Sequence, residues 1–171
     1  VSVPEQTISL SDGQEKAIEF SLVGDNGVEV KKSFVFRADS YIADLAVELK
    51  QNGQAVPNTK LAIGASIGDH AINHHSIYHS ESEAVVAVNG DIKRHQGGYS
   101  FTYDANNRST LSDNGPIDWV GMSDSYFGMV AVPAAAVQTV EYQASKFDVQ
   151  IEPYYRTIFQ WIIRSPETHE T

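Results

Sequence analysis

The stretch Ile117–Pro133 reads IDWVGMSDSYFGMVAVP and guides the interpretation of the whole chain. It predicts two short strands that meet at a polar turn, Ser123-Asp124-Ser125. Trp119, Tyr126 and Phe127 stand close to that turn, and aromatic side chains bury large areas. We therefore expect these three side chains to form a packing centre in the core, in preference to an exposed surface that stacks on a sugar or a peptide.

Apolar residues recur at every second position through much of the chain. They do so in Ile18–Leu22, Val28–Phe36, Tyr41–Leu49, Tyr99–Tyr103 and Phe147–Ile151. Alternation places one set of side chains on a buried sheet face and the other in water. Half-exposed antiparallel sheets have this pattern. The sequence therefore predicts an all-β protein whose many short strands close as a sandwich or barrel.

Turn signals separate the alternating runs. Asn and Gly tolerate positive φ and so favour tight turns. They occur in Asp25-Asn26-Gly27, Asn52-Gly53, Asn89-Gly90-Asp91 and Asp113-Asn114-Gly115-Pro116. Asn89-Gly90 gives the clearest hairpin, because Val85–Val88 precedes it and Ile92 follows it.

The segment Tyr154–Arg164, YYRTIFQWIIR, fits both a helical stripe and a strand face. Its Thr, Ile, Phe, Trp and Tyr residues favour a strand, which is our prediction. Gly68–Glu83 is weakly patterned and predicts a loop with one helical turn at most. Residues 165–171 predict a polar tail.

Composition limits the classes of function. The 171 residues, 42% hydrophobic and 20% charged, suit one globular domain over residues 1–171. The formal net charge of −10 argues against nucleic acid and against docking on anionic lipid. The absence of cysteine excludes disulfides, thiolate metal sites and cysteine nucleophiles. No apolar run reaches the ~20 residues of a membrane span.

Four of the six histidines lie between Asp69 and His79. On a helix, His70 and His74 share one face while His75 and His79 share another, and on a strand the two pairs fall on opposite faces. Neither arrangement brings four imidazoles together, and no HExxH pattern adds a base. We interpret these histidines as solvated loop residues and predict no metal or other cofactor.

Nucleophilic and phosphate-binding sites have little support in the sequence. Gly64-Ala65-Ser66-Ile67-Gly68 lacks the order of a Gly-x-Ser-x-Gly elbow, and Gly97-Gly98 stands alone. Lys93-Arg94-His95 is the only basic cluster, and we interpret it as a charged sheet surface. We predict no catalytic residue and no enzymatic activity.

Two stretches resemble one protein family, the periplasmic domain of YidC-type membrane protein insertases. The first carries Trp119-Val120-Gly121, Tyr126-Phe127 and a strand that ends in Pro133. The second runs from Lys32 to Arg37 through Asp39-Ser40-Tyr41 to Asn52-Gly53, with Ser9–Gly13 and Gly27–Val30 upstream. The resemblance covers roughly residues 8–133. It marks Trp119, Gly121, Tyr126, Phe127 and Pro133 as the structural signature.

The resemblance implies an antiparallel β-supersandwich similar to the galactose mutarotase-like fold. It implies a periplasmic domain beside the transmembrane part of an inner-membrane protein, with some outer terminal strands missing from this chain. It also implies an interaction surface for Sec translocon components or nascent membrane proteins, reached by an open strand edge or a cleft.

The alternative is a carbohydrate-binding or mutarotase-like module, which belongs to the same fold class. Opening a sugar ring needs a general acid and a general base at one ring. His95, Tyr99, Glu141 and Asp148 are the residues available for this. Nothing in the sequence brings them together, and a shared fold does not transfer an activity. We expect them to be exposed polar residues.

Overall fold

The computed structural model describes residues 7–57, 59–64, 82–124, 126–151 and 154–167, with side chains as far as Phe147. These residues form antiparallel sheets, with one short helix, so the all-β prediction is confirmed. They group into two compact units, of which the second spans Lys60–Glu167. The prediction of a single domain stays a prediction.

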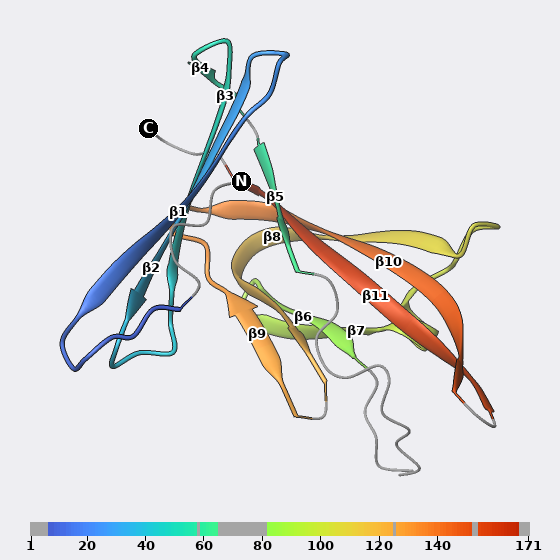
Figure 1. Cartoon of the computed structure of the whole chain (residues 1–171). Coiled ribbons are helices and arrows are strands. Elements are labelled where there is room, and N and C mark those ends of the chain that lie inside the picture. The colour runs from blue at the N-terminus through green and yellow to red at the C-terminus, as the bar shows by residue number, and fades with distance from the viewer. Residues whose placement is uncertain (1–6, 58, 65–81, 125, 152–153, 168–171) are drawn as a thin grey trace. The chain divides into compact units, whose positions relative to one another are not determined.

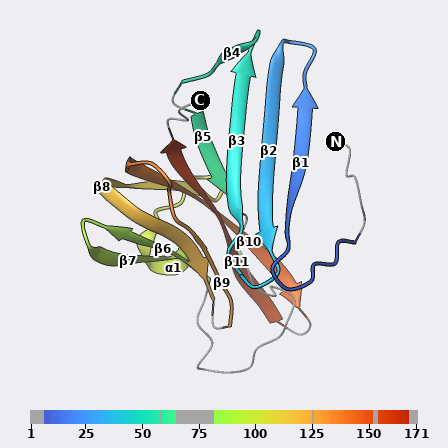
Figure 2. The same cartoon turned by 90° about the vertical axis from the view of Figure 1, so that its left-hand side faces the viewer.

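The first unit is a four-stranded sheet. Its strands are β1 (Glu15–Val23), β2 (Val28–Arg37), β3 (Asp44–Gln51) and β4 (Gln54–Ala55), paired in the order β1-β2-β3-β4. Figure 2 shows them side by side. β3 and β4 meet at Asn52 and Gly53, which have φ values of 53° and 79°, as a tight hairpin turn requires.

The alternation of the first unit separates two faces as predicted. Ile18 pairs with Phe34, which pairs with Leu45, so these three apolar side chains share one face. The ring centroids of Phe20 and Phe34 lie 6.1 Å apart in an edge-to-face arrangement. The opposite face carries ion pairs, among them Lys31 Nζ to Glu19 Oε1 at 2.8 Å.

The second unit contains a seven-stranded sheet. Its elements are β5 (Thr59–Ile63), β6 (Glu83–Val88), β7 (Asp91–Gln96), α1 (Gly97–Ser100), β8 (Arg108–Ser123), β9 (Gly128–Ala131), β10 (Val137–Ile151) and β11 (Tyr154–Glu167). The strands pair in the order β5-β11-β10-β8-β6-β7, and β9 pairs with β8 beside them. The choice of strand for Tyr154–Arg164 is confirmed.

The long strand β8 bends, and its two halves pair with different strands (Figure 1). Its first half pairs with β10, and its second half pairs with β6 and β9. The register slips twice at the bend. Asn114 and Ile117 of β8 are three positions apart but pair with residues of β10 that are two positions apart, Thr139 and Val137. Asp118 is the extra residue of β8 opposite β6. Such bulges turn a strand from one layer into another.

This bend corrects one prediction. Asp113-Asn114-Gly115-Pro116 is not a turn between strands but part of β8. Gly115 has a φ of 129°, and Pro116 donates no backbone hydrogen bond, so the sequence breaks the ladder without ending the strand. A second prediction is also wrong: Tyr99–Tyr103 is not a strand, since α1 occupies its beginning and no strand follows before Arg108.

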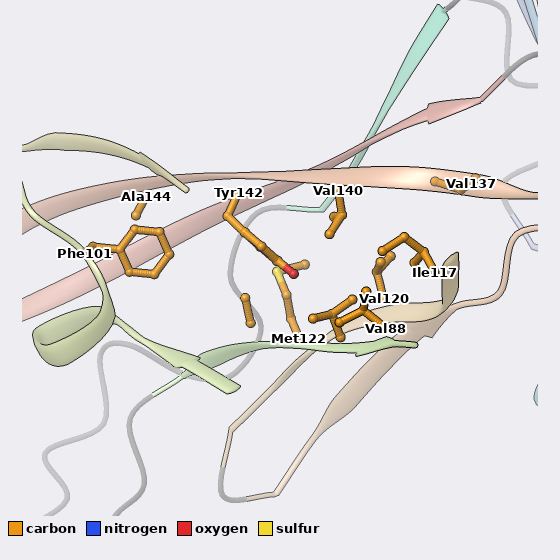
Figure 3. Close-up of a cluster of buried hydrophobic side chains, with 11 residues drawn as sticks. Val88, Phe101, Ile117, Val120, Met122, Val137, Val140, Tyr142 and Ala144 are labelled. Carbon is orange, nitrogen blue, oxygen red and sulfur yellow. The ribbon is translucent and has the colours of Figure 1, made fainter. Parts of the chain in front are cut away.

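The hydrophobic core of the second unit lies inside the curl of its sheet. Val140 and Tyr142 project from β10 toward Val120 and Met122 of β8 and toward Val88 of β6 (Figure 3). The core residues are Ala84, Val86, Val88, Phe101, Ile117, Val120, Met122, Val137, Val140, Tyr142 and Ala144. The predicted closure of alternating apolar residues as two layers therefore occurs within this unit.

Candidate functional site

A carboxylate lies at the polar end of the core of the second unit. Asp113 of β8 is only 7% exposed, and its oxygens accept three hydrogen bonds. Lys93 Nζ donates to Oδ1 at 2.7 Å, His95 Nε2 lies 2.7 Å from Oδ2, and the Tyr142 hydroxyl donates to Oδ2 at 3.1 Å. We call Lys93, His95, Asp113 and Tyr142 the Asp113 cluster.

The cluster joins three strands that are not all neighbours in the sheet. Lys93 and His95 come from the outer strand β7, whereas Asp113 and Tyr142 come from β8 and β10. The order β10-β8-β6-β7 separates β7 from β10 by two strands, so only the curl brings their side chains together. The His95 and Tyr142 rings lie 4.8 Å apart between centroids. The cluster therefore closes the curled sheet.

The ionisation of the cluster follows from this geometry. Burial alone would raise the pKa of the Asp113 carboxyl, but the hydrogen bonds from Lys93, His95 and Tyr142 outweigh burial and lower it. Burial, and next the adjacent Asp113 charge, raise the pKa of the Tyr142 hydroxyl. Asp113 is therefore an anion at neutral pH and Tyr142 a neutral donor, so His95 must carry its proton on Nε2 to bond the carboxylate.

The residues considered for sugar chemistry do not come together. His95 bonds Asp113, while Glu141 points to the other side of β10 and pairs with Lys60 Nζ at 2.8 Å. Tyr99 is exposed, and the side chain of Asp148 lies outside the described residues. The interpretation of Lys93-Arg94-His95 as surface charge is wrong for His95, which is largely buried against Asp113; Lys93 also bonds Asp113 but keeps about half of its side chain exposed.

The sequence does contain one signal for the Asp113 cluster. Asp113 shares its parity with Leu111 and Ile117, and all three side chains point inward from β8. A polar residue in register with core positions indicates a buried, satisfied group. The Asn-Gly-Pro run that follows it favoured a turn and hid this register.

The turn of the β8–β9 hairpin, residues 123–128, presents aromatic side chains to solvent. Tyr126 is 75% exposed and Phe127 is 63% exposed, so their predicted place in the core is wrong. The carboxylate of Asp124 accepts hydrogen bonds from the backbone N–H groups of Tyr126 and Phe127, at 2.7 and 2.6 Å. The Asp124 N–H donates to the Phe127 carbonyl at 2.9 Å. These bonds fix the backbone of Tyr126 and Phe127 against Asp124, while both aromatic side chains lie at the surface.

The strands behind this loop carry an apolar row on the side of the sheet opposite the core cluster, in which Val130 is exposed and Val85 is buried. Val130 of β9 pairs with Gly121 of β8, which pairs with Val85 of β6. A Cβ on Gly121 would lie 2.7 Å from the Met129 carbonyl oxygen, so this position has no room for a side chain. Trp119 lies half-buried two residues before Gly121, and Pro133 follows the end of β9.

No described group of His, Asp and Glu residues is arranged to hold a metal ion. The histidines between His70 and His79 lie outside the described residues, and so does the loop predicted over most of Gly68–Glu83. Across the described residues, no helix has the length and apolar character of a membrane span.

Comparison with known proteins identifies the family of this chain. The family model of the YidC periplasmic domain matches residues 2–160. Because that match covers most of the chain, the chain belongs to the YidC periplasmic domain family. Members of this family lie on the periplasmic face of the inner membrane, as the sequence resemblance predicted.

One relative gives the family a named member. The protein named membrane protein insertase YidC from Methylobacillus flagellatus is 25% identical over 126 residues. Those residues are 72% of this chain but only 22% of that protein, so the chain spans about a fifth of its relative. No solved structure matches the chain significantly, and the likeness to the galactose mutarotase-like fold stays a prediction.

Proposed function

We propose that this chain is a non-catalytic interaction domain of a membrane protein insertase. It offers a surface to Sec translocon components or nascent membrane proteins, beside the transmembrane part of its parent protein. The family match spans both compact units, which supports treating residues 1–171 as one periplasmic domain.

The observation that carries this proposal is the exposed aromatic tip of the β8–β9 hairpin. Exposed apolar surface next to a polar surround is typical of interaction sites. Tyr126 and Phe127 are held outward by the Asp124 hydrogen bonds, so their exposure is part of the local structure. A preformed surface binds with a smaller loss of conformational entropy than a disordered one.

The Asp113 cluster supports a non-catalytic role. It has an imidazole, a carboxylate and a phenol in contact, which are groups that acid–base catalysis uses. Each of them is engaged by the others, and Asp113 and Tyr142 are buried against the core. Their hydrogen bonds satisfy buried polar groups where the sheet closes, which is a structural task.

Photo-crosslinking tests the proposal in the full-length parent protein. A photoreactive amino acid replaces Phe127, and the same amino acid replaces Glu29, an exposed residue on β2, as the control. The targets are stalled nascent chains of a membrane protein and the Sec translocon subunits. We expect adducts from position 127 and none from position 29. Absence of adducts from both positions would contradict the proposal.

A further inference from the structure

We infer that the outer edge of β9 accepts an extended apolar segment with basic flanks, from a client polypeptide, as an additional antiparallel or parallel strand. This inference rests on the proposed function and assigns its binding surface. Binding of this kind uses backbone hydrogen bonds for affinity and alternate side chains for specificity.

The first argument is the composition of the edge. Within the described part of the chain, β9 pairs with β8 alone, through Gly128–Ala131. Its sequence, GMVA, has no charged residue and no proline. Edge strands are normally protected by charges, proline or bulges, because an unpaired backbone edge attracts further strands.

The other outer strands carry such protection. β1 has Glu15, Lys16 and Glu19, and β7 has four charged or imidazole side chains among its six residues, in the run DIKRHQ. β5 contains Lys60, and β4 has only two residues. Among the described outer strands, β9 is therefore the least protected against strand addition.

The second argument is the pattern of side chains beside the edge. Val130 is 59% exposed on the outer side of the sheet, and Val132, two residues on, is exposed as well. Met129 and Ala131 point the other way and pack against the core. An added strand with apolar residues at alternate positions would extend the row that Val130 forms with Gly121 and Val85.

The third argument is charge complementarity, which selects the occupant. Asp124 lies in the loop at the Gly128 end of β9, and the exposed Asp118 lies on β8 just beyond the residues paired with the other end. The chain as a whole has a net charge of −10. An uncharged apolar segment with lysine or arginine on both flanks matches this arrangement, whereas an anionic lipid surface does not.

Fluorescence anisotropy of labelled peptides with the whole chain tests the inference. The probe is a peptide of alternating valine and threonine between two pairs of lysines. Two comparison peptides carry glutamate in place of the lysines, or N-methyl groups on alternate backbone nitrogens, which cannot complete a strand ladder. We expect the lysine peptide to bind, and both comparison peptides to bind at least tenfold more weakly.

Two matched variants locate the site. Val130→Lys places a charge on the β9 edge, and Val23→Lys makes the same change at a residue that is 75% exposed on the edge strand β1 of the first unit. We expect Val130→Lys to weaken binding at least tenfold and Val23→Lys to change it less than twofold. Both positions are exposed, and far-ultraviolet circular dichroism checks that both variants fold.

Several results would overturn the inference. They are equal binding of the N-methylated peptide, unchanged binding to Val130→Lys, or equal losses in the two variants. The inference would also be overturned, in favour of a lipid surface, if the wild-type protein cosedimented with anionic vesicles and the Val130→Lys variant did not. If crosslinking from position 127 still succeeds in any of these cases, the proposed function stands and only the β9 edge is wrong.

Discussion

Removal of the Asp113 carboxylate should destabilise the second unit more than removal of the Tyr142 hydroxyl that bonds it. In Asp113→Ala the fully buried Tyr142 hydroxyl loses its acceptor, and an unsatisfied buried donor costs about 1–3 kcal/mol. His95, also largely buried, loses a charge-assisted bond of about 1.5–3 kcal/mol. Lys93 is half exposed and regains water, so it adds little.

The expected loss is therefore about 3–5 kcal/mol in the free energy of unfolding, a large part of the ~5–15 kcal/mol of a typical domain. Tyr142→Phe keeps the ring and leaves Asp113 two donors, so it should cost only about 1.5–3 kcal/mol. Urea unfolding followed by circular dichroism measures both. A loss below 1 kcal/mol for Asp113→Ala, or a greater loss for Tyr142→Phe, would refute the view that the carboxylate closes the sheet.

Three further predictions concern backbone contacts and pH. Gly121→Ala should lower the stability by about 1–3 kcal/mol in urea unfolding, because its Cβ would meet the Met129 carbonyl oxygen, whereas Gly128→Ala, with no atom nearer than 3.9 Å, should be nearly neutral. Asp124→Ala should speed amide hydrogen exchange in the loop after it, since two N–H groups lose their acceptor; unchanged exchange would contradict this. The pKa of Asp113 is lowered by folding, so its stabilisation is complete above about pH 4 and is lost as the pH falls through the folded value. The pKa of the Tyr142 hydroxyl is raised by folding, so its contribution to the free energy of unfolding is complete below about pH 10 and is lost as the pH rises further. Tyr142→Phe should therefore remove the loss of stability at alkaline pH.

The strands were largely predictable because one local rule governs them. Alternation located most of β1 to β3 and the end of β10, and the Asn-Gly pairs located three hairpins. Asn89 and Gly90 have φ values of 54° and 79°, the conformation for which such pairs are favoured. The failure at Asp113–Pro116 has a physical reason: residues that break a ladder look the same in a turn and in a bulge.

The candidate site was less predictable because it depends on contacts between distant strands. His95 meets Asp113 only when the sheet curls, and no local pattern encodes that curl. The exposure of Phe127 was missed because aromatic residues usually favour the core, whereas here the Phe127 N–H bonds the Asp124 carboxylate and the ring lies in solvent. The family resemblance did not depend on this burial, since the match rests on the sequence over residues 2–160.

The bend in β8 affects the order in which this protein can fold during its synthesis, which starts at the N-terminus. β6 and the second half of β8 expose their apolar rows until β10 arrives to cover them, and β10 begins only at Val137. The meander β1 to β4, whose pairings are all between consecutive strands, needs no later segment to complete its hydrogen bonds. For most of its synthesis, the second unit therefore remains an unfinished and aggregation-prone intermediate, while the N-terminal sheet can already be paired.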